Sequence, residues 1–451
     1  MKIHFIAIGG SAMHNLAIAL HKKGYIISGS DDEIFNPAKS KLEKYGLLPK
    51  EIGWNRDNIN DDLDAIILGM HAKKDNPELI KAQEMNLKIY SYPEFLYEMS
   101  KDKIRIVIGG SHGKTTITAM ILHVLNKMNI DTDYMVGAQL EGFEVMVRIS
   151  EKAKYMVLEG DEYLTSPIDL RPKFHLYKPN IALISGIAWD HINVFPTFEI
   201  YVEQFRIFCE KIEGSGSLVY CREDERVKEV SENARKDIKK LPYGIIPHKI
   251  ENGITTIIWK GKEYEMSVFG KHNLMNLYGA MLICEEIGIS NEDFLSSISS
   301  FTGASKRLEL VKKNDNVAIY KDFAHSPSKL KATISALKEQ YLQRKLVAAM
   351  ELHTFSSLTK EFLLEYKGAM DEADIAIVYF NPHTIAHKRL PPITPEQVYS
   401  SFGRKDIIIC TDSNEVIEVI KSQKWENRNL LMMSSGNFDG ISFEKLALEI
   451  I

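Results

Sequence analysis

Residues 104–125 read IRIVIGGSHGKTTITAMILHVL, and this stretch decides how the rest of the chain is interpreted. An apolar run ends at Ile108, a glycine-rich turn occupies 109–116, and apolar residues then recur at helical spacing from Ile117 to Leu125. This order predicts a strand, a tight loop and the N-terminus of a helix. Such a loop turns its N–H groups inward and adds the positive end of the helix dipole, so it is suited to bind phosphate groups.

The polar residues of this turn indicate a nucleoside triphosphate and a metal ion. Lys114 is placed to reach the outer phosphates, and the Thr115 hydroxyl is placed to ligate Mg²⁺. The spacing G-x-x-G-K-T departs from the usual Walker pattern, because Ile108 stands five positions before Gly113. The alternative is a glycine-rich turn with an exposed lysine and no ligand. The residues expected to bind the nucleotide here are Gly110, Ser111, His112, Gly113, Lys114, Thr115 and Thr116.

The bulk composition is that of an ordinary globular protein and argues against several functional classes. A chain of 451 residues is too long for one core, so two to four domains are expected. The net charge of -5 gives no reason to expect a nucleic-acid partner. No apolar run approaches the ~18–20 residues of a membrane span, so no membrane segment is expected. Neither a nucleic acid nor a membrane is therefore expected as a partner.

The cysteines and the N-terminus bear on location. Four cysteines lie far apart with no C-x-x-C pair, so neither a zinc site nor a disulfide framework is predicted, and a cytoplasmic location fits. The apolar run from Ile3 to Ile8 leads directly into a glycine turn and an amphipathic segment. We therefore interpret it as a buried first strand and not as a secretion signal.

Residues 1–100 are predicted to form a small, doubly wound, Rossmann-like domain. Apolar strands alternate with helical segments, and this alternation builds a parallel sheet with its ligand at the carboxyl ends of the strands. The first turn, GGSAMH at 9–14, is an incomplete dinucleotide fingerprint, and Asp31 stands where such a fold offers an acid after the second strand. A tight turn without a ligand is the alternative.

Residues 101–303 are predicted to form a central, P-loop ATPase-like domain that begins with the glycine-rich turn at 109–116. One further buried strand ends in an acidic group and another ends in Asp190-His191; the acidic group is Glu159, Asp161 and Glu162. Beside a phosphate loop, such strand ends are suited to ligate Mg²⁺, with water and phosphate oxygens in the remaining positions. Ordinary surface residues are the alternative.

Residues 304–451 are predicted to form a second Rossmann-like α/β domain. Its first strand ends at Asp322, and His325 follows three residues later. The two preceding domains share a pattern of apolar strand, Gly-Gly-Ser and helix, which suggests two phosphorylated ligands, one for each of those domains.

With these motifs in hand, the chain resembles the Mur ligase family, ATP-dependent amide-forming enzymes of peptidoglycan synthesis and recycling. The resemblance runs nearly end to end and rests on GGSHGKTT, LEGDEY, the strand end at Asp190-His191, GKHNLMN, SKRLEL and KDFAHSP, which match in order and spacing. The family's short ATP loop also accounts for the departure from Walker spacing. The resemblance implies a three-domain α/β ligase of cell wall biogenesis that uses ATP and Mg²⁺.

The resemblance also implies roles for individual residues. The catalytic set would be Lys114, His191, Arg307 and His325, and the Mg²⁺ ligands would be Thr115, Glu159 and His191. Asn273 and Asn276 would lie near the adenine and Asp322 near the ribose. The UDP moiety would be held by Gly9, Gly10, Ser11, Met13, Ser30 and Asp31.

The chain departs from the family pattern at two places. Several members carry a carbamylated lysine that completes a second metal site, and an ungapped count from Asp190-His191 puts Arg206 at that position. Arginine cannot be carbamylated in that way, so a second Mg²⁺ would need another ligand or water. The first turn reads His14-Asn15 where close relatives tend to have two glycines.

The amine substrate is the finer question. The pattern DEYLTSPIDLRPKF, together with DFAH and SSGNFDGI, resembles the murein peptide ligases, which join UDP-N-acetylmuramate to L-alanyl-γ-D-glutamyl-meso-diaminopimelate. The expectation is therefore this tripeptide, and the alternative is a ligase that adds L-alanine to UDP-N-acetylmuramate. A nucleotide-dependent binding protein is the rival of another class, although such a protein does not need a cation at the γ-phosphate.

Overall fold

The computed structural model describes residues 1–140, 142–189, 194–303 and 308–451. It consists of two compact units, which are described separately. The first comprises Met1–Ile246 with Met275–Ile298, and the second comprises Pro247–Leu274 with Ser299–Ile451. In the part of the chain that the structure describes, no helix is long and apolar enough to cross a membrane.

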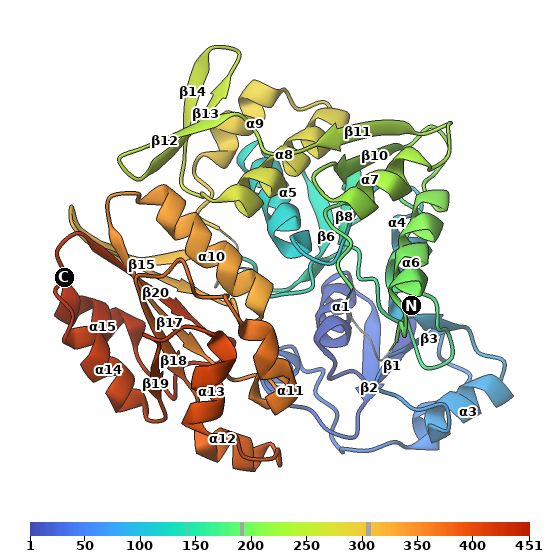
Figure 1. Cartoon of the computed structure of the whole chain (residues 1–451). Coiled ribbons are helices and arrows are strands. Elements are labelled where there is room, and N and C mark those ends of the chain that lie inside the picture. Colours follow the sequence, from blue (N-terminus) through green and yellow to red (C-terminus); the bar gives the residue numbers. More distant parts are fainter. Residues whose placement is uncertain (141, 190–193, 304–307) are drawn as a thin grey trace. The chain divides into compact units, whose positions relative to one another are not determined.

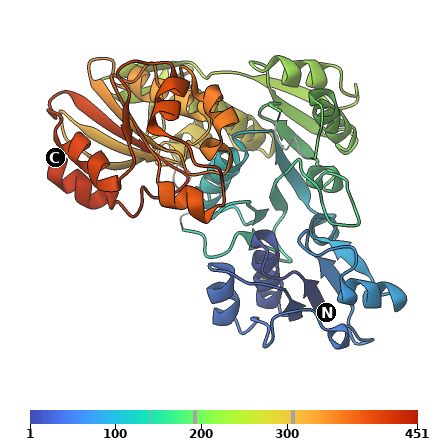
Figure 2. The same ribbon diagram turned by 60° about the horizontal axis from the view of Figure 1, so that its bottom comes forward.

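The first unit begins with a parallel sheet of strand order β2-β1-β3-β4, drawn in blue in Figures 1 and 2. Its strands are β1 (Lys2–Ile6), β2 (Ile26–Ser30), β3 (Ala65–Leu68) and β4 (Ile89–Ser91), and its helices are α1 (Ser11–Lys22), α2 (Ala38–Lys44), α3 (Pro77–Glu84) and α4 (Tyr92–Ser100). β3 is buried along its whole length, as expected for a strand with helices on both faces. Helix α4 begins with a capping box between Ser91 and Glu94.

The second sheet of this unit carries the glycine-rich turn. Its strand order is β11-β10-β9-β5-β8-β6-β7, and only the edge pair β6–β7 is antiparallel among these neighbours. The strands are β5 (Ile104–Gly109), β6 (Thr132–Met135), β7 (Val147–Arg148), β8 (Tyr155–Glu159), β9 (Ile181–Ile184), β10 (Ser217–Cys221) and β11 (Lys239–Tyr243). The helices are α5 (Lys114–Lys127), α6 (Phe198–Glu210), α7 (Glu225–Glu232) and α9 (Asn291–Ile298). Helix α8 (Lys271–Glu286) belongs to this unit from Met275 onward, and its first four residues belong to the second unit.

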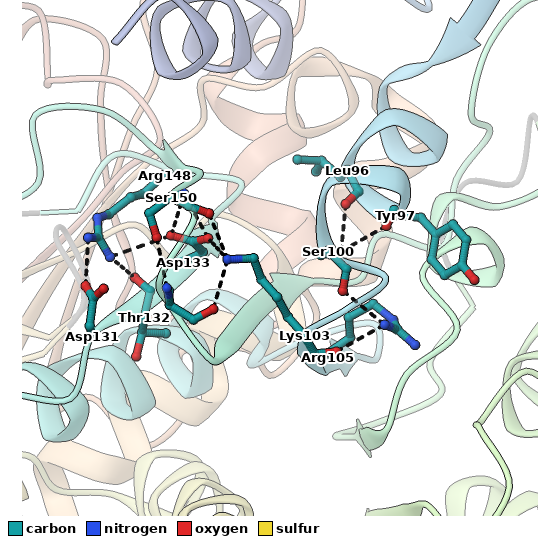
Figure 3. A network of polar contacts seen from close by, with 11 residues as sticks. Leu96, Tyr97, Ser100, Lys103, Arg105, Asp131, Thr132, Asp133, Arg148 and Ser150 are labelled. Carbon is teal, nitrogen blue, oxygen red and sulfur yellow. Dashed lines mark hydrogen bonds and ion pairs between the residues drawn. The ribbon is translucent and has the colours of Figure 1, made fainter. Parts of the chain in front are cut away.

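The buried side chain of Arg105 donates hydrogen bonds to the segment that joins these two sheets (Figure 3). The side chain of Arg105 is 3% exposed, and its Nη1 donates to the carbonyls of Ser100, Lys101 and Lys103 at 2.8–3.1 Å. Its Nε donates to the carbonyls of two residues before β9, Tyr177 and Lys178, at 3.0 Å each. One guanidinium therefore satisfies carbonyls from two separate segments of the chain.

A buried carboxylate continues this network. Asp133 on β6 is fully buried, pairs with Lys103 Nζ at 2.8 Å and accepts the Ser150 N–H with both oxygens at 2.9–3.0 Å (Figure 3). Lys103 Nζ also donates to the carbonyls of Ser150 and Ala153. Buried charges persist in proteins when they are paired and hydrogen-bonded in this way.

The second unit contains an antiparallel sheet of order β12-β13-β14 and a larger sheet of order β15-β16-β20-β17-β18-β19. The strands are β12 (His248–Glu251), β13 (Ile254–Trp259), β14 (Lys262–Met266), β15 (Glu309–Lys313), β16 (Ala318–Asp322), β17 (Lys345–Glu351), β18 (Ile375–Tyr379), β19 (Ile408–Cys410) and β20 (Arg428–Met433). The helices are α10 (Pro327–Gln340), α11 (Lys360–Leu363), α12 (Pro382–His387), α13 (Pro395–Phe402), α14 (Ser413–Lys421) and α15 (Phe443–Ile450).

Helices cover both faces of the larger sheet, because successive residues of a strand point to opposite sides. On β17, Ala348 and Met350 belong to the core cluster that contains residues of α10 and α13. The alternate residues Val347 and Ala349 belong to the cluster that contains residues of α14 and α15. The two clusters account for the buried, Ala- and Val-rich sequence of this strand.

All four cysteines are free and buried in this fold. Burial raises the pKa of Cys209 to about 12 and that of Cys410 to about 11. Burial also raises the pKa of Cys221 and of Cys284. Every thiol is therefore held in its neutral form at neutral pH.

Candidate active site

The glycine-rich turn lies between β5 and α5, and its backbone conformation requires glycine at two positions. Gly110 has φ of 126° and Gly113 has φ of 80°, both in the range that other residues rarely adopt. A Cβ on Gly110 would lie 2.9 Å from the backbone N of Ser185, and one on Gly113 would lie 2.6 Å from Asn276 Oδ1. The turn is therefore held tightly against the end of β9 and the start of α8.

Lys114 is the first residue of α5, and its ammonium group is nearly buried in the turn. Nζ donates to the Gly110 carbonyl and to Glu162 Oε2, each at 2.7 Å. Burial opposes the charged form, but the carboxylates of Glu162 and Asp161 outweigh it and raise the pKa of Lys114. The turn thus holds a permanent positive charge beside its N–H groups, as the binding of a polyphosphate requires.

Thr115 and Glu159 form the second polar pair of the turn. Parallel pairing of β5 with β8 sets Glu159 opposite Ile108, and Thr115 Oγ1 donates to Glu159 Oε1 at 2.7 Å. The other carboxylate oxygen accepts the Gly137 N–H at 2.9 Å. Burial and the neighbouring Asp161 raise the pKa of Glu159. A hydroxyl and a carboxylate this close together fit the oxygen-ligand preference of Mg²⁺.

The remaining residues of the turn contact the end of β9. Ser111 N donates to the Gly186 carbonyl, and Ser111 Oγ accepts the Ala188 N–H, each at 2.9 Å. The Ser185 hydroxyl donates to the His112 carbonyl. Thr116 is buried in the first turn of α5. The contacts of Ser185 and Gly186 with the turn were not predicted from the sequence, because these two residues carry no motif of their own.

The acidic strand end after β8 contains more interactions than the sequence indicated. Glu162 is 1% exposed and also accepts the hydroxyl of Tyr201 on α6 at 3.2 Å. Asp161 pairs with Lys173 Nζ at 3.4 Å, and the same ammonium group lies 3.9 Å from the centroid of the Tyr163 ring. The acids at 161 and 162 thus have cationic partners of their own, which distinguishes them from Glu159.

The first sheet presents a second glycine turn, between β1 and α1. Asp31 Oδ2 accepts the Gly9 N–H at 2.6 Å, and a Cβ on Gly9 would approach that oxygen to 2.9 Å. Gly10 is the residue before α1, so the free N–H groups of this helix begin at Ser11. Met13 is buried one turn further along the helix.

Ser30 is placed differently from the expected UDP contact. Its hydroxyl is buried and donates to Glu78 Oε2, and Glu78 is itself fully buried on α3. His4 Nε2 lies 3.3 Å from the same carboxylate. The Ser30 carbonyl accepts the N–H groups of Ala7 and Ile8. The Ser30 hydroxyl therefore forms part of a buried hydrogen-bond network between the first sheet and α3.

Asp31→Asn is expected to stabilise the fold at neutral pH. Burial raises the pKa of Asp31 to about 6, although the Gly9 N–H favours the charged form. Above pH 6 the folded chain thus carries a poorly solvated carboxylate. In the variant the amide oxygen would still accept the Gly9 N–H, and only the part-buried Asp32 N–H, which donates to Oδ1 at 3.0 Å, would lose its acceptor. We expect a gain of about 1 kcal/mol, measured by urea unfolding at pH 8.

The pH dependence of this gain provides its control. An acid with a raised folded pKa destabilises the fold above that pKa, and the cost disappears as pH falls from about 6 to its ordinary value of 3.8. Wild type and Asp31→Asn should therefore become equally stable at pH 4. A gain that is the same at pH 4 and pH 8 would contradict this explanation.

The other predicted ligand residues are divided between the two units. Asn276 belongs to the first unit and lies against Gly113. Asn273 belongs to the second unit, where Nδ2 donates to the Phe269 carbonyl at 3.0 Å. Asp322, also in the second unit, accepts the N–H groups of residues 308 and 324 at 2.7 and 2.6 Å. Its neighbour His325 contacts the Phe323 carbonyl through Nδ1 at 2.8 Å.

Three predictions concern metal and γ-phosphate ligands. His191 and Arg307 lie outside the described residues. Arg206 is described, and it lies exposed on α6 with Glu203 at 3.1 Å and Glu229 at 3.3 Å. That a second Mg²⁺ would need a ligand other than Arg206, or water, therefore stays a prediction. Among the described residues there is no cluster of three or more His, Cys, Asp or Glu side chains that could hold a metal ion.

Comparison with known proteins gives the family. Family models match residues 2–104 (Mur ligase family, catalytic domain), 108–284 (Mur ligase middle domain) and 306–436 (Mur ligase, glutamate ligase domain). A curated relative from Caldicellulosiruptor bescii is 32% identical over 88% of this chain and 87% of its own length. The chain belongs to the Mur ligase family. It is therefore an ATP-dependent ligase that forms a carbon–nitrogen bond, and the predicted fold class of three α/β domains is confirmed.

The comparisons also correct the assignment within the Mur ligase family. The C. bescii relative is named UDP-N-acetylmuramate–L-alanine ligase, as is a Clostridium perfringens relative that is 30% identical over 97% of this chain and 95% of its own length. The prediction of a murein peptide ligase acting on the tripeptide is therefore wrong. A Thermotoga maritima UDP-N-acetylmuramate-alanine ligase structure covers 100% of this chain and 98% of its own, with a TM-score of 0.69 and 20% identity, and shows the shared fold.

Proposed function

We propose that this Mur ligase joins UDP-N-acetylmuramate to L-alanine in peptidoglycan synthesis. The observation that carries the proposal is that the curated relatives aligned over nearly the whole chain bear the name of this activity. The glycine turns of the first unit support it, because one is suited to a nucleoside triphosphate and the other to a second phosphorylated ligand. Both substrates and the amine are small molecules.

The proposed reaction proceeds through an acyl phosphate. The carboxylate of N-acetylmuramate attacks the γ-phosphorus of ATP, a P–O bond to ADP breaks, and the mixed anhydride forms. The amine of L-alanine then attacks the acyl carbon, its proton passes to a base, and inorganic phosphate leaves with the former C–O bonding pair. Both steps gain most from positioned reactants and from cations that balance the developing charge.

The residues of the first unit supply such a site. Lys114 would exchange its contact with Glu162 for the β- and γ-phosphates, whose charge it neutralises. Mg²⁺ would be held by Thr115 and Glu159, whose oxygens already lie 2.7 Å apart, and it would withdraw charge from the phosphates when bound. Gly9, Gly10, Ser11, Met13 and Asp31 would surround the UDP moiety at the N-terminus of α1.

Residues elsewhere in the chain would complete the site. Asn276 and Asn273 are assigned to the adenine and Asp322 to the ribose. His325 is assigned to the incoming amine, whose proton it could accept, since burial lowers its pKa and favours the neutral ring. His191 is assigned to the metal and Arg307 to the γ-phosphate. The three domains are taken as 1–100, 101–303 and 304–451.

The amine specificity is tested by substrate-dependent phosphate release. With ATP, Mg²⁺ and UDP-N-acetylmuramate present, L-alanine should raise the rate at least tenfold above that with glycine or L-serine, since a small apolar pocket discriminates by about 10–200-fold. Mass spectrometry should find UDP-N-acetylmuramoyl-L-alanine. A higher rate with L-alanyl-γ-D-glutamyl-meso-diaminopimelate than with L-alanine would overturn the proposal.

A further inference from the structure

The side chains of His14 and Asn15 turn back into the first turn of α1. Each residue is 3% exposed. His14 Nδ1 lies 2.9 Å from the Gly10 carbonyl oxygen, and Asn15 Nδ2 lies 2.8 Å from that of Ser11. The C=O and the following N–H of a trans peptide share one plane and point in opposite directions. The Gly10 carbonyl also accepts the helix N–H of His14 at 2.9 Å, so the side chains reinforce the backbone bonds that set the directions of the N–H groups of Ser11 and Ala12, which are unpaired donors of a helix N-terminus.

The hydrogen bonds between the two side chains are consistent only with a neutral histidine. The Gly10 carbonyl can only accept, so Nδ1 of His14 carries the hydrogen. Asn15 Oδ1 accepts the Met146 N–H at 3.0 Å, so Nδ2 faces Nε2 of His14 at 3.0 Å and donates to it. Burial lowers the pKa of His14 and favours this neutral form. Each polar atom of both side chains thus has a suitable partner.

The connection continues from Met146 to the candidate metal ligand. The Met146 carbonyl accepts the Val136 N–H at 2.9 Å, which extends the β6–β7 pairing by one residue. The next residue, Gly137, donates its N–H to Glu159 Oε2 at 2.9 Å. Glu159 in turn accepts the hydroxyl of Thr115. A continuous series of hydrogen bonds and peptide units therefore runs from the Gly9–Gly10 turn to the ATP-binding turn.

An ion-pair cluster holds the same segment to the first sheet's helices. Between β6 and β7, Glu144 contacts Lys22 Nζ on α1 at 2.7 Å and Lys44 Nζ on α2 at 2.6 Å, and accepts the Tyr45 hydroxyl at 2.5 Å. These partners lower the pKa of Glu144 to about 2, so it is charged at any physiological pH. The connection made by Asn15 is thus not an isolated contact.

From this geometry we propose that Asn15, with His14, is a positioning residue that aligns the N–H groups of the UDP-binding turn and fixes the segment that orients Glu159. The inference rests on the proposed function, because it takes the turn at Gly9–Ser11 as the site of the UDP-linked substrate. His14 contacts the turn alone, whereas Asn15 contacts both the turn and Met146, whose carbonyl accepts the Val136 N–H. The two residues therefore predict different patterns of loss.

Calorimetric titration separates these two roles. UDP-N-acetylmuramate alone and Mg²⁺ with AMP-PNP alone would each be titrated into wild type, Asn15→Leu, His14→Leu and the control His21→Ala, an exposed residue on the same helix. Asn15→Leu loses the hydrogen bonds to Ser11 and to Met146. It should weaken the affinity for UDP-N-acetylmuramate and the affinity for AMP-PNP by about tenfold each. His14→Leu should weaken only the affinity for UDP-N-acetylmuramate, by about fivefold, and His21→Ala should change neither affinity.

The outcomes are distinguishable. A wild type that does not bind UDP-N-acetylmuramate overturns the proposed function and this inference with it. If wild type binds and Asn15→Leu leaves either affinity within about twofold, the inference alone is overturned. Steady-state rates add a check, because loss of positioning raises KM for UDP-N-acetylmuramate while a general loss of structure lowers the active fraction and hence kcat alone. His14→Leu provides the same test of the UDP turn if Asn15→Leu folds poorly.

Discussion

Replacing Lys114 with arginine should abolish ligation while leaving the fold intact. The ammonium group fits a nearly buried position between the Gly110 carbonyl and Glu162, and a guanidinium is too large to occupy it in the same way. The guanidinium would still form an ion pair with Glu162, so the buried carboxylate would keep a cationic partner. We expect kcat to fall by roughly 10³-fold or more, as for other cations at a transferring phosphoryl group.

Phosphate release at saturating substrates measures this loss, and circular dichroism shows whether the variant is folded. Lys114→Ala should be equally inactive but less stable, because it leaves Glu162 buried without its cation. Lys127→Ala is the matched control, since Lys127 lies exposed in the last turn of the same helix. Turnover of Lys114→Arg within tenfold of wild type would rule out the role given to this residue.

Arg105→Leu should cause the largest loss of stability in the molecule. The substitution removes the donors for the carbonyls of Ser100, Lys101, Lys103, Tyr177 and Lys178, of which the hydrogen bonds to Ser100 and Tyr177 are buried and the other three part-buried. Unsatisfied buried acceptors cost about 1–3 kcal/mol each, and relaxation recovers part of this. We expect a loss of about 3–5 kcal/mol in the free energy of unfolding.

Urea unfolding followed by tryptophan fluorescence would give this value, and Arg206→Leu is the matched control. Arg206 has two acidic partners, Glu203 and Glu229, but all three side chains are exposed, and an exposed ion pair contributes at most ~1 kcal/mol. Because Arg105 is at the start of β5 and the ATP-binding turn follows its end, the folded fraction of Arg105→Leu should keep its kcat. Equal losses for the two arginines would contradict the argument.

The ATP-binding turn could be predicted because its signals are local. Strand, glycines, lysine and helix follow one another within residues 104–125, and Glu159 ends the next buried strand of a parallel sheet, whose carboxyl ends share one edge. The partners of these residues could not be predicted in the same way. Ser185 touches the turn through its hydroxyl after a separation of more than seventy residues, and nothing in its own sequence context marks it.

Other differences follow from tertiary contacts that no local pattern contains. Ser30 is the last residue of β2, but its hydroxyl donates to Glu78 on helix α3. Residues 222–240 carry many charges, which alone would favour a solvated helix throughout, whereas the structure has the short helix α7 followed by the edge strand β11. β11 reads KKLPY, and its charges and Pro242 suit an edge position while hiding the alternation typical of a strand.

The four buried thiols allow unfolding to be followed without an added probe. A neutral, enclosed sulfur does not react with an alkylating reagent, so labelling occurs only through states in which that part of the chain opens. Cys209, Cys221 and Cys284 belong to the first unit and Cys410 to the second. The rate at which each cysteine is alkylated, read by peptide mass spectrometry, therefore measures the opening of each unit separately in one unmodified sample.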